Sequence, residues 1–122
     1  MIFSTRILKI CNAEGRFFWA KLDPVVGSET AETRPVLTVS NDVNNQYGAT
    51  VTVLPVTSST AKIYPFEVPL DANESGLRNE SKAKANQIRT IDKSRLGNKI
   101  GQLDSAKMKA VELAILIHLD IF

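Results

Sequence analysis

An arginine and two neighbouring hydroxyl residues are candidates for binding a phosphate group. Arg34 stands at the exit of the polar stretch LDPVVGSETAETRP, residues 22–35, and the proline that follows it favours extended backbone geometry. A guanidinium fixed at the start of a strand can donate two parallel hydrogen bonds to a phosphate. Thr57 and Ser58 follow another apolar run and offer hydroxyl donors at a strand-to-loop edge, where functional sites commonly lie. Taken singly, an Arg-Pro pair at a strand start and a Thr-Ser pair in a turn are both common in proteins without any role in binding.

The other residue types exclude several catalytic arrangements. His118 is the only histidine and Cys11 the only cysteine, so one chain has no pair of histidines, no internal disulfide and no CxxC metal site. His118 lies in an apolar run, which favours a packed or rim histidine over a catalytic one. The sequence contains no G-x-x-x-x-G-K-[ST], G-x-G-x-x-G, H-E-x-x-H or G-x-S-x-G, and therefore gives no support to a nucleotide-cradling loop, a zinc peptidase or a serine hydrolase.

The charged residues are distributed unevenly along the chain. Residues 12–80 contain five Lys/Arg and nine Asp/Glu, a net charge of −4, whereas residues 82–109 contain eight and two, a net charge of +6. The basic stretch fits a phosphate-binding face. The alternative is a solvated, lysine-rich edge and helix start.

The length and the N-terminal segment predict one cytoplasmic domain. With 122 residues, the chain can bury one core but not two independent ones. No apolar run approaches the roughly 18 residues of a membrane span, and MIFSTRILKI is interrupted by Arg6 and Lys9 and lacks a cleavage site for a signal peptide. We expect a single domain over residues 1–122 with no membrane contact, in which residues 1–13 are a loose N-terminal extension.

Alternating patterns predict five strands before a single helix. The strands are expected at residues 16–23, 36–41, 49–56, 64–70 and 84–91, because β-branched and aromatic residues are bounded there by Gly, Pro and Asn. The fourth is expected at an edge because it contains two prolines. Residues 44–48 are expected to form a turn and residues 71–80 a loop. Asp92 is expected to cap one helical turn that ends at Gly97.

The C-terminal residues have helical periodicity. From Asp104 or Ser105, either of them a good N-cap, apolar residues recur at helical spacing to the end of the chain. Strands closed by one helix of about four turns predict a mainly β fold. We expect a small, strongly bent antiparallel sheet or barrel with the helix packed on it. Because the last half of the helix is apolar nearly all round, we expect a partner chain to cover part of it.

Five stretches in register resemble the MazF/PemK family of toxin endoribonucleases, which belong to type II toxin–antitoxin systems. They are LDPVVGSE with Arg34 five positions after its glutamate, VLTVSND, LPVTS, PFEVPL, and NQIRTIDKSRL followed by the closing helix. The resemblance runs from about Gly15 to the C-terminus. It implies a small SH3-like barrel that forms a homodimer and cleaves single-stranded RNA without a metal or other cofactor. It also implies a cognate MazE-like antitoxin whose acidic tail occupies the RNA groove.

The resemblance further implies roles for individual residues. Arg34 and Thr57 are expected to be catalytic, donating to the phosphoryl oxygens while a ribose 2′-hydroxyl attacks the adjacent phosphate. The loop at residues 22–35 would border the RNA cleft. Six other side chains are expected to contact the substrate: Ser28, Glu29, Ser58, Lys84, Asn86 and Gln87. Phe17 and Trp19 are candidates for base stacking, with core packing expected for at least one of them.

Departures from the family pattern leave the general base and the activity open. Relatives carry acidic or other residues where this chain has Lys84 and Asn86, and an amide does not take up a proton near neutral pH. Lys82 and Lys84 are expected on one face of a strand, where two positive charges would strengthen phosphate contacts. Glu29 could order its loop, hydrogen-bond a base or ribose, or help activate the nucleophile. Two other functions also stay open: a non-nucleolytic toxin of the same fold that binds a protein target such as gyrase, and a cleavage-inactive RNA-binding relative.

Overall fold

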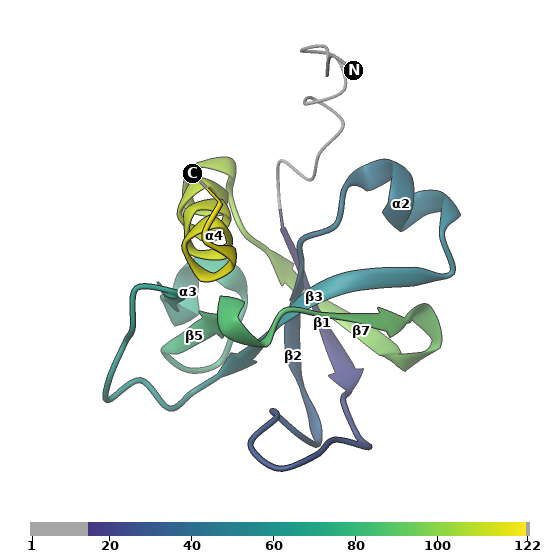
Figure 1. The fold of residues 1–122 in the computed structure, drawn as a ribbon, viewed down its shortest axis with the longest axis horizontal. Coiled ribbons are helices and arrows are strands. Elements are labelled where there is room, and N and C mark those ends of the chain that lie inside the picture. Colours follow the sequence, from purple (N-terminus) through teal and green to yellow (C-terminus); the bar gives the residue numbers. More distant parts are fainter. Residues whose placement is uncertain (1–14, 122) are drawn as a thin grey trace.

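The computed structural model describes residues 15–121, in which an antiparallel sheet is covered by a C-terminal helix (Figure 1). The strands are β1 (Arg16–Lys21), β2 (Thr33–Thr38), β3 (Thr50–Thr57), β4 (Glu67–Leu70), β5 (Ser81–Lys84), β6 (Arg89–Asp92) and β7 (Leu96–Gln102). The helices are α2 (Asp42–Tyr47), α3 (Ala72–Ser75) and α4 (Ser105–Leu119), and two 3₁₀ turns are η1 (Ala85–Gln87) and η2 (Lys93–Arg95). The expected extension at residues 1–13 lies outside the described residues.

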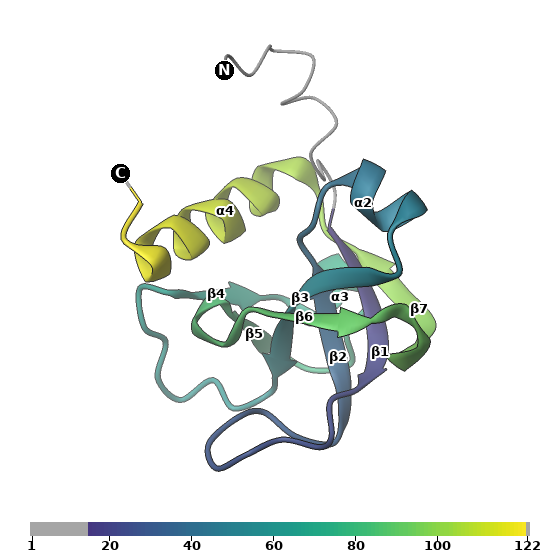
Figure 2. The same ribbon diagram turned by 45° about the vertical axis from the view of Figure 1, so that its right-hand side comes forward.

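The longest strand, β3, organises the sheet. Its order is β4-β5-β3-β2-β1-β7, and β6 pairs with β3 outside this path. One edge of β3 pairs with β2, while the other pairs first with β6 and then with β5. Pro55, which has no N–H to donate, falls between the β6 and β5 ladders on that second edge. The prediction of a mainly β fold with a C-terminal helix is confirmed, and within residues 15–121 the sheet is a strongly bent, SH3-like sheet that is not closed into a ring (Figure 2).

Alternate residues of the strands supply two hydrophobic clusters. Leu54 and Val56 of β3 enter the cluster that also packs against α4, while Val51 and Val53 of the same strand enter a second cluster. The two clusters take alternate residues of β3 because successive side chains of a β-strand point to opposite faces of the sheet. Each fully buried side chain of this kind contributes about 1.5–3 kcal/mol. The bend of the sheet is therefore fixed from both of its faces.

The C-terminal helix starts where the sequence predicted and leaves an apolar face uncovered. The Asp104 side chain caps α4 by accepting a hydrogen bond from the Lys107 backbone N–H at 2.7 Å. Met108, Val111 and Ala114 are its buried residues. On its outer side Leu113, Leu116 and Leu119 are exposed, and so is Ile121 just after the helix. His118 is exposed as well, at the rim of the core as expected, and none of the helices within residues 15–121 is long and apolar enough to cross a membrane.

Three local predictions were wrong. Residues 44–47 belong to helix α2, not to a turn, and Gly48 is the C-cap of that helix. The Asn41 side chain caps its N-terminus by accepting from the Asn44 N–H at 2.8 Å. The expected strand at 84–91 is divided into β5 and β6 by η1. The expected loop at 71–80 contains the short helix α3, which ends at Gly76 in the left-handed conformation.

The segment after β6 was predicted in part. The Asp92 side chain accepts from the Ser94 N–H at 2.8 Å and caps η2, as expected. The turn ends at Arg95, and the chain enters β7 directly. This strand was missed because LGNKIGQ has two glycines and little alternation, and its register with β1 is irregular. The prediction that residues 64–70 form an edge strand is confirmed by β4, which starts three residues later than expected.

Candidate active site

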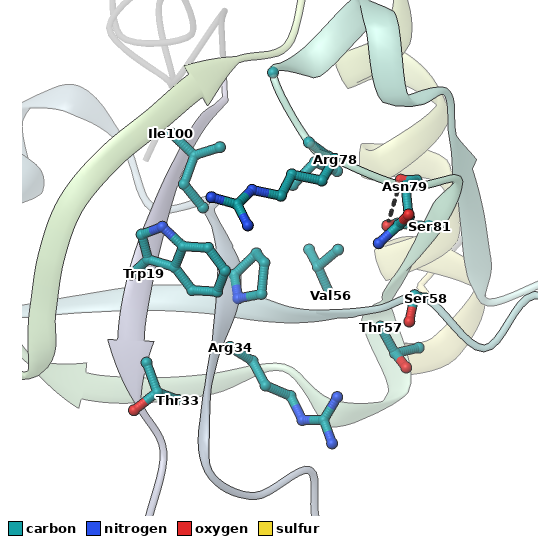
Figure 3. A pocket seen from close by; sticks show the side chains of 13 residues that line it. Trp19, Thr33, Arg34, Val56, Thr57, Ser58, Arg78, Asn79, Ser81 and Ile100 are labelled. Atoms are coloured by element: carbon teal, nitrogen blue, oxygen red, sulfur yellow. Dashed lines mark hydrogen bonds between the residues drawn. The ribbon is translucent and has the colours of Figure 1, made fainter.

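A cleft of about 340 Å³ lies between the strands β1, β2, β3 and β7 and the segment that joins α3 to β5 (Figure 3). Its polar lining residues are Thr33, Arg34, Thr57, Ser58, Arg78, Asn79 and Ser81. Its apolar lining residues are Trp19, Pro35, Val56, Leu77 and Ile100, with Gly76 beside them. The described lining therefore has two guanidinium groups, hydroxyls and an amide but no carboxylate, so its electrostatics favour an anion. Among the side chains that the structure describes, no three His, Cys, Asp or Glu residues are grouped to hold a metal ion.

Arg34 is held in this cleft by the loop that precedes it. It is the second residue of β2 and is half-buried, and its Nε donates a hydrogen bond to the Ala31 carbonyl at 2.9 Å. In Figure 3 its guanidinium extends toward the end of β3, where Thr57 and Ser58 lie. None of the groups that the structure describes accepts a hydrogen bond from its two terminal nitrogens. A guanidinium fixed through Nε can present those nitrogens to a ligand.

Thr57 and Ser58 reach the cleft because β3 ends there. Thr57 is the last residue of β3 and pairs with Lys82 of β5. Its hydroxyl oxygen accepts from the Ser59 N–H at 3.3 Å, which leaves the hydroxyl proton available to a ligand. Three of the residues predicted from the sequence, Arg34, Thr57 and Ser58, thus share one cleft although they come from two strands.

The wall formed by residues 76–81 was not predicted as part of the site. Arg78, Asn79 and Ser81 line the cleft, and the Ser81 hydroxyl donates to the Asn79 carbonyl at 2.9 Å. Gly76 brings this wall close to β7: its φ is +79°, and a Cβ there would lie 2.7 Å from the Ile100 carbonyl oxygen. Gly76 could have indicated in the sequence that a helix ends there. No motif or spacing in the sequence, however, indicates that Arg78 lies near Arg34.

The two aromatic candidates for base stacking occupy different places. Phe17 is fully buried in the core, whereas Trp19 is 39% exposed and lines the cleft. The expectation that at least one of them packs in the core is confirmed. Trp19 offers the cleft an indole surface on which a base could stack.

The residues predicted in the β1–β2 loop lie outside the cleft lining. The Glu29 carboxylate accepts from the Val26 N–H at 2.6 Å, which corresponds to the first of its three expected roles, ordering the loop. Gln87 accepts from the Thr30 N–H at 2.6 Å and donates to the Ser28 carbonyl at 3.4 Å. The structure therefore joins Gln87 to the loop, and in this arrangement its amide fixes the backbone of residues 28–30.

The remaining predicted contacts are on β5 and η1. Lys84 is half-buried at the end of β5 and Asn86 is exposed on η1; neither lines the cleft. The expectation that Lys82 adds an accessible positive charge was wrong. Its ammonium group is buried beside β4, where it donates to the Glu67 carboxylate at 3.0 Å and to the Lys62 carbonyl at 2.8 Å.

Two further cations of the basic stretch also make internal contacts. Arg89 donates to the Leu22 carbonyl at 3.1 Å. Arg95 donates to the carbonyls of Lys21 at 3.1 Å and Asp23 at 2.5 Å. Both guanidinium groups thereby hold the start of the β1–β2 loop. Part of the basic stretch serves the fold and is not an open phosphate-binding face.

Known proteins similar to this chain agree with the sequence resemblance. The model of the PemK-like, MazF-like toxins of type II toxin–antitoxin systems matches residues 13–119. Endoribonuclease MazF9 of Mycobacterium tuberculosis is 41% identical over 113 residues, which cover 88% of this chain and 96% of that protein. Endoribonuclease EndoA of Bacillus subtilis is 42% identical over 106 residues, which cover 86% and 91%. The solved structure of the Mycobacterium tuberculosis toxin MazF-mt6 superposes with a TM-score of 0.76 at 31% identity, covering 88% of this chain and 98% of that one. The chain belongs to the family of PemK-like, MazF-like toxins of type II toxin–antitoxin systems.

Proposed function

We propose that this protein is a sequence-specific, metal-independent endoribonuclease toxin that cleaves single-stranded RNA, including mRNA, in the cytoplasm. The observation that carries the proposal is the presence of Arg34 and Thr57, from different strands, in one cleft whose described lining has cations and hydroxyls but no carboxylate. The names of MazF9 and EndoA, both endoribonucleases, support the same activity.

The cleft residues suit a transfer to the neighbouring 2′-hydroxyl. The ribose 2′-oxygen attacks the adjacent phosphorus and loses its proton, the bond from phosphorus to the 5′-oxygen breaks, and that oxygen leaves protonated. The products are a 2′,3′-cyclic phosphate and a 5′-hydroxyl. Arg34 stabilises the charge that builds on the phosphoryl oxygens, and the Thr57 hydroxyl donates to the same group. Arg34 is not the proton donor, because a guanidinium stays protonated in proteins.

Cleavage of RNA in EDTA tests this proposal. The purified protein is incubated with a long unstructured RNA and with its DNA equivalent, and the cut ends are mapped. We expect cuts in RNA only, at a recurring short sequence and with 5′-hydroxyl ends, since DNA lacks the attacking hydroxyl. Arg34→Ala should slow cleavage on the order of 10²- to 10³-fold. Arg16→Ala, which removes a cation outside the cleft that pairs with Asp42, is the matched control.

Intact RNA at every protein concentration would contradict the proposal. Salt-sensitive RNA binding without any product would then favour a cleavage-inactive RNA-binding relative. Absence of both binding and cleavage would favour a non-nucleolytic toxin that acts on a protein target.

We also propose two protein partners. Leu113 and Leu119 on the outer face of α4 are 51% and 48% exposed, and a homodimer that covers this face would remove their apolar surface from water.

A cognate MazE-like antitoxin would place an acidic segment in the cationic cleft. Sedimentation of the wild type and of Leu113→Glu tests the first interaction, for which we expect a dimer and a monomer respectively. Competition between an acidic antitoxin peptide and RNA tests the second.

A further inference from the structure

Arg78 gives the cleft a second cation, on a different wall from the first. We propose that Arg78 binds a backbone phosphate of the RNA other than the scissile one, and so fixes how the strand lies across the cleft. This inference rests on the proposed function. In Figure 3 the two guanidinium groups lie on different sides of the cleft, with Arg34 extending toward Thr57 and Arg78 toward Trp19.

The two arginines are anchored differently, which separates their tasks. Arg34 is half-buried and fixed through Nε by the Ala31 carbonyl, as charge stabilisation in a transition state requires. Arg78 is exposed, and none of the side chains or carbonyls that the structure describes accepts a hydrogen bond from its guanidinium. An arginine side chain without an internal partner keeps its rotamer freedom until a ligand orders it. It is therefore suited to holding a bound strand, and less suited to stabilising a short-lived charge at one fixed point.

The backbone on both sides of Arg78 is held by contacts, although its guanidinium has no described partner. Leu77 is buried in the main hydrophobic cluster, and the Ser81 hydroxyl donates to the Asn79 carbonyl next to Arg78. Gly76 packs against the Ile100 carbonyl on the other side. The guanidinium can thus move only within the reach of one side chain from a fixed point on the cleft wall.

The charge of the cleft calls for more than one phosphate. Arg34 and Arg78 share a cavity of about 340 Å³ in which no described lining residue is acidic. Like charges in one cleft repel, and bound anions relieve that repulsion. One phosphodiester carries a single negative charge, so a scissile phosphate at Arg34 leaves Arg78 without a counterion. A neighbouring phosphate of the same RNA strand supplies this counterion. Trp19, on strand β1 between β2 and β7, offers a surface on which a base could stack.

Single-phosphate neutralisation tests the contact. The probes are the shortest RNA that binds the protein and a series in which one phosphate at a time is replaced by a neutral methylphosphonate. For the wild type we expect one non-scissile replacement to weaken binding about tenfold, as the loss of a charge-assisted hydrogen bond does. For Arg78→Gln the same replacement should cost nothing further, because its partner is already gone. Lys109→Gln, which removes an exposed cation outside the cleft, should respond like the wild type.

Two further measurements separate binding from chemistry. Arg78→Gln should raise KM about tenfold and change kcat by less than about threefold, and it should reduce the slope of log Kd against log salt by about 0.7, the value for one phosphate on a single strand. A loss in kcat at unchanged KM would place Arg78 at the scissile phosphate and overturn the inference. So would a response identical to Lys109→Gln, or lost affinity for an acidic antitoxin peptide at unchanged RNA affinity. If the wild type cleaves nothing, the proposed function fails, while the binding series still decides the role of Arg78.

Discussion

The buried pair of Lys82 and Glu67 predicts a large loss of stability that a second substitution restores. Its side chains are only 10% and 3% exposed, and the ammonium group lies 3.0 Å from the carboxylate. The same ammonium donates to the Lys62 carbonyl, and the same carboxylate accepts from the Tyr64 N–H at 2.9 Å. Removing either charge leaves the other buried without its partner.

The expected magnitude follows from what remains after each change. Breaking a buried ion pair by removing one partner costs about 3–5 kcal/mol. In Lys82→Met the Glu67 carboxylate keeps the Tyr64 N–H, so we expect the lower end, about 3 kcal/mol. In Lys82→Met/Glu67→Gln no charge remains and the amide oxygen still accepts from Tyr64, so the total cost should fall to about 1 kcal/mol.

Urea unfolding of the wild type, both single variants and the double variant measures this coupling. All four proteins are compared at one concentration, because self-association would shift the apparent stability. A cost below about 1 kcal/mol for Lys82→Met, or a double variant that costs as much as the two single variants together, would refute the reasoning. Either outcome would mean that the pair is hydrated in solution.

Three other predictions concern single side chains. Thr57→Val removes the hydroxyl at nearly constant volume and should slow RNA cleavage on the order of 10²-fold with unchanged RNA affinity, measured by single-turnover kinetics. Gly76→Ala should cost about 1–3 kcal/mol in urea unfolding because its φ is +79° and the new Cβ meets a β7 carbonyl; Gly27→Ala, at φ +58° with no atom within 4 Å, shares the strain without the clash and should cost less. The hydrogen bonds that Ser94 donates to Asp92 lower the pKa of this carboxyl below its ordinary 3.8, so its contribution to stability is present above that pH and is lost as the pH falls through the lowered value. The difference in urea midpoint between wild type and Asp92→Asn should therefore shrink toward pH 3, and a constant difference would contradict this.

The strands with strong alternation could be predicted from the sequence, and those without it could not. β1 has three consecutive aromatic residues, β3 alternates threonine and valine in its first half, and α4 has a capping aspartate before a long apolar stripe. β7 has neither signal, because its pairing with β1 comes from tertiary contact and not from local propensity. The sequence also did not indicate that η1 divides residues 84–91 into two strands, because this division depends on where β3 changes its pairing from β6 to β5.

The candidate site was predictable only in part. Arg34 was found because it lies near the start of a strand and precedes a proline, and Thr57 because it ends a strand before a serine-rich turn. The order of these two residues also matched a family pattern. Arg78 and Asn79 were missed because they follow a short helix in a polar segment that gives no sign of facing a cleft. Their place depends on how closely Gly76 lets that segment approach β7, which is a property of the folded chain.

The segment with the highest net positive charge does not supply the arginines of the cleft. Both cleft arginines, Arg34 and Arg78, come from residues 12–80, whose net charge is −4. In the stretch of net charge +6, Lys82 is buried in an ion pair, and Arg89 and Arg95 hold the start of the β1–β2 loop. A guanidinium that donates to backbone carbonyls stabilises a loop and still leaves its charge near it. Arg89 and Arg95 therefore act on the cleft indirectly, because they hold the start of the loop whose Ala31 carbonyl accepts from Arg34 near its other end.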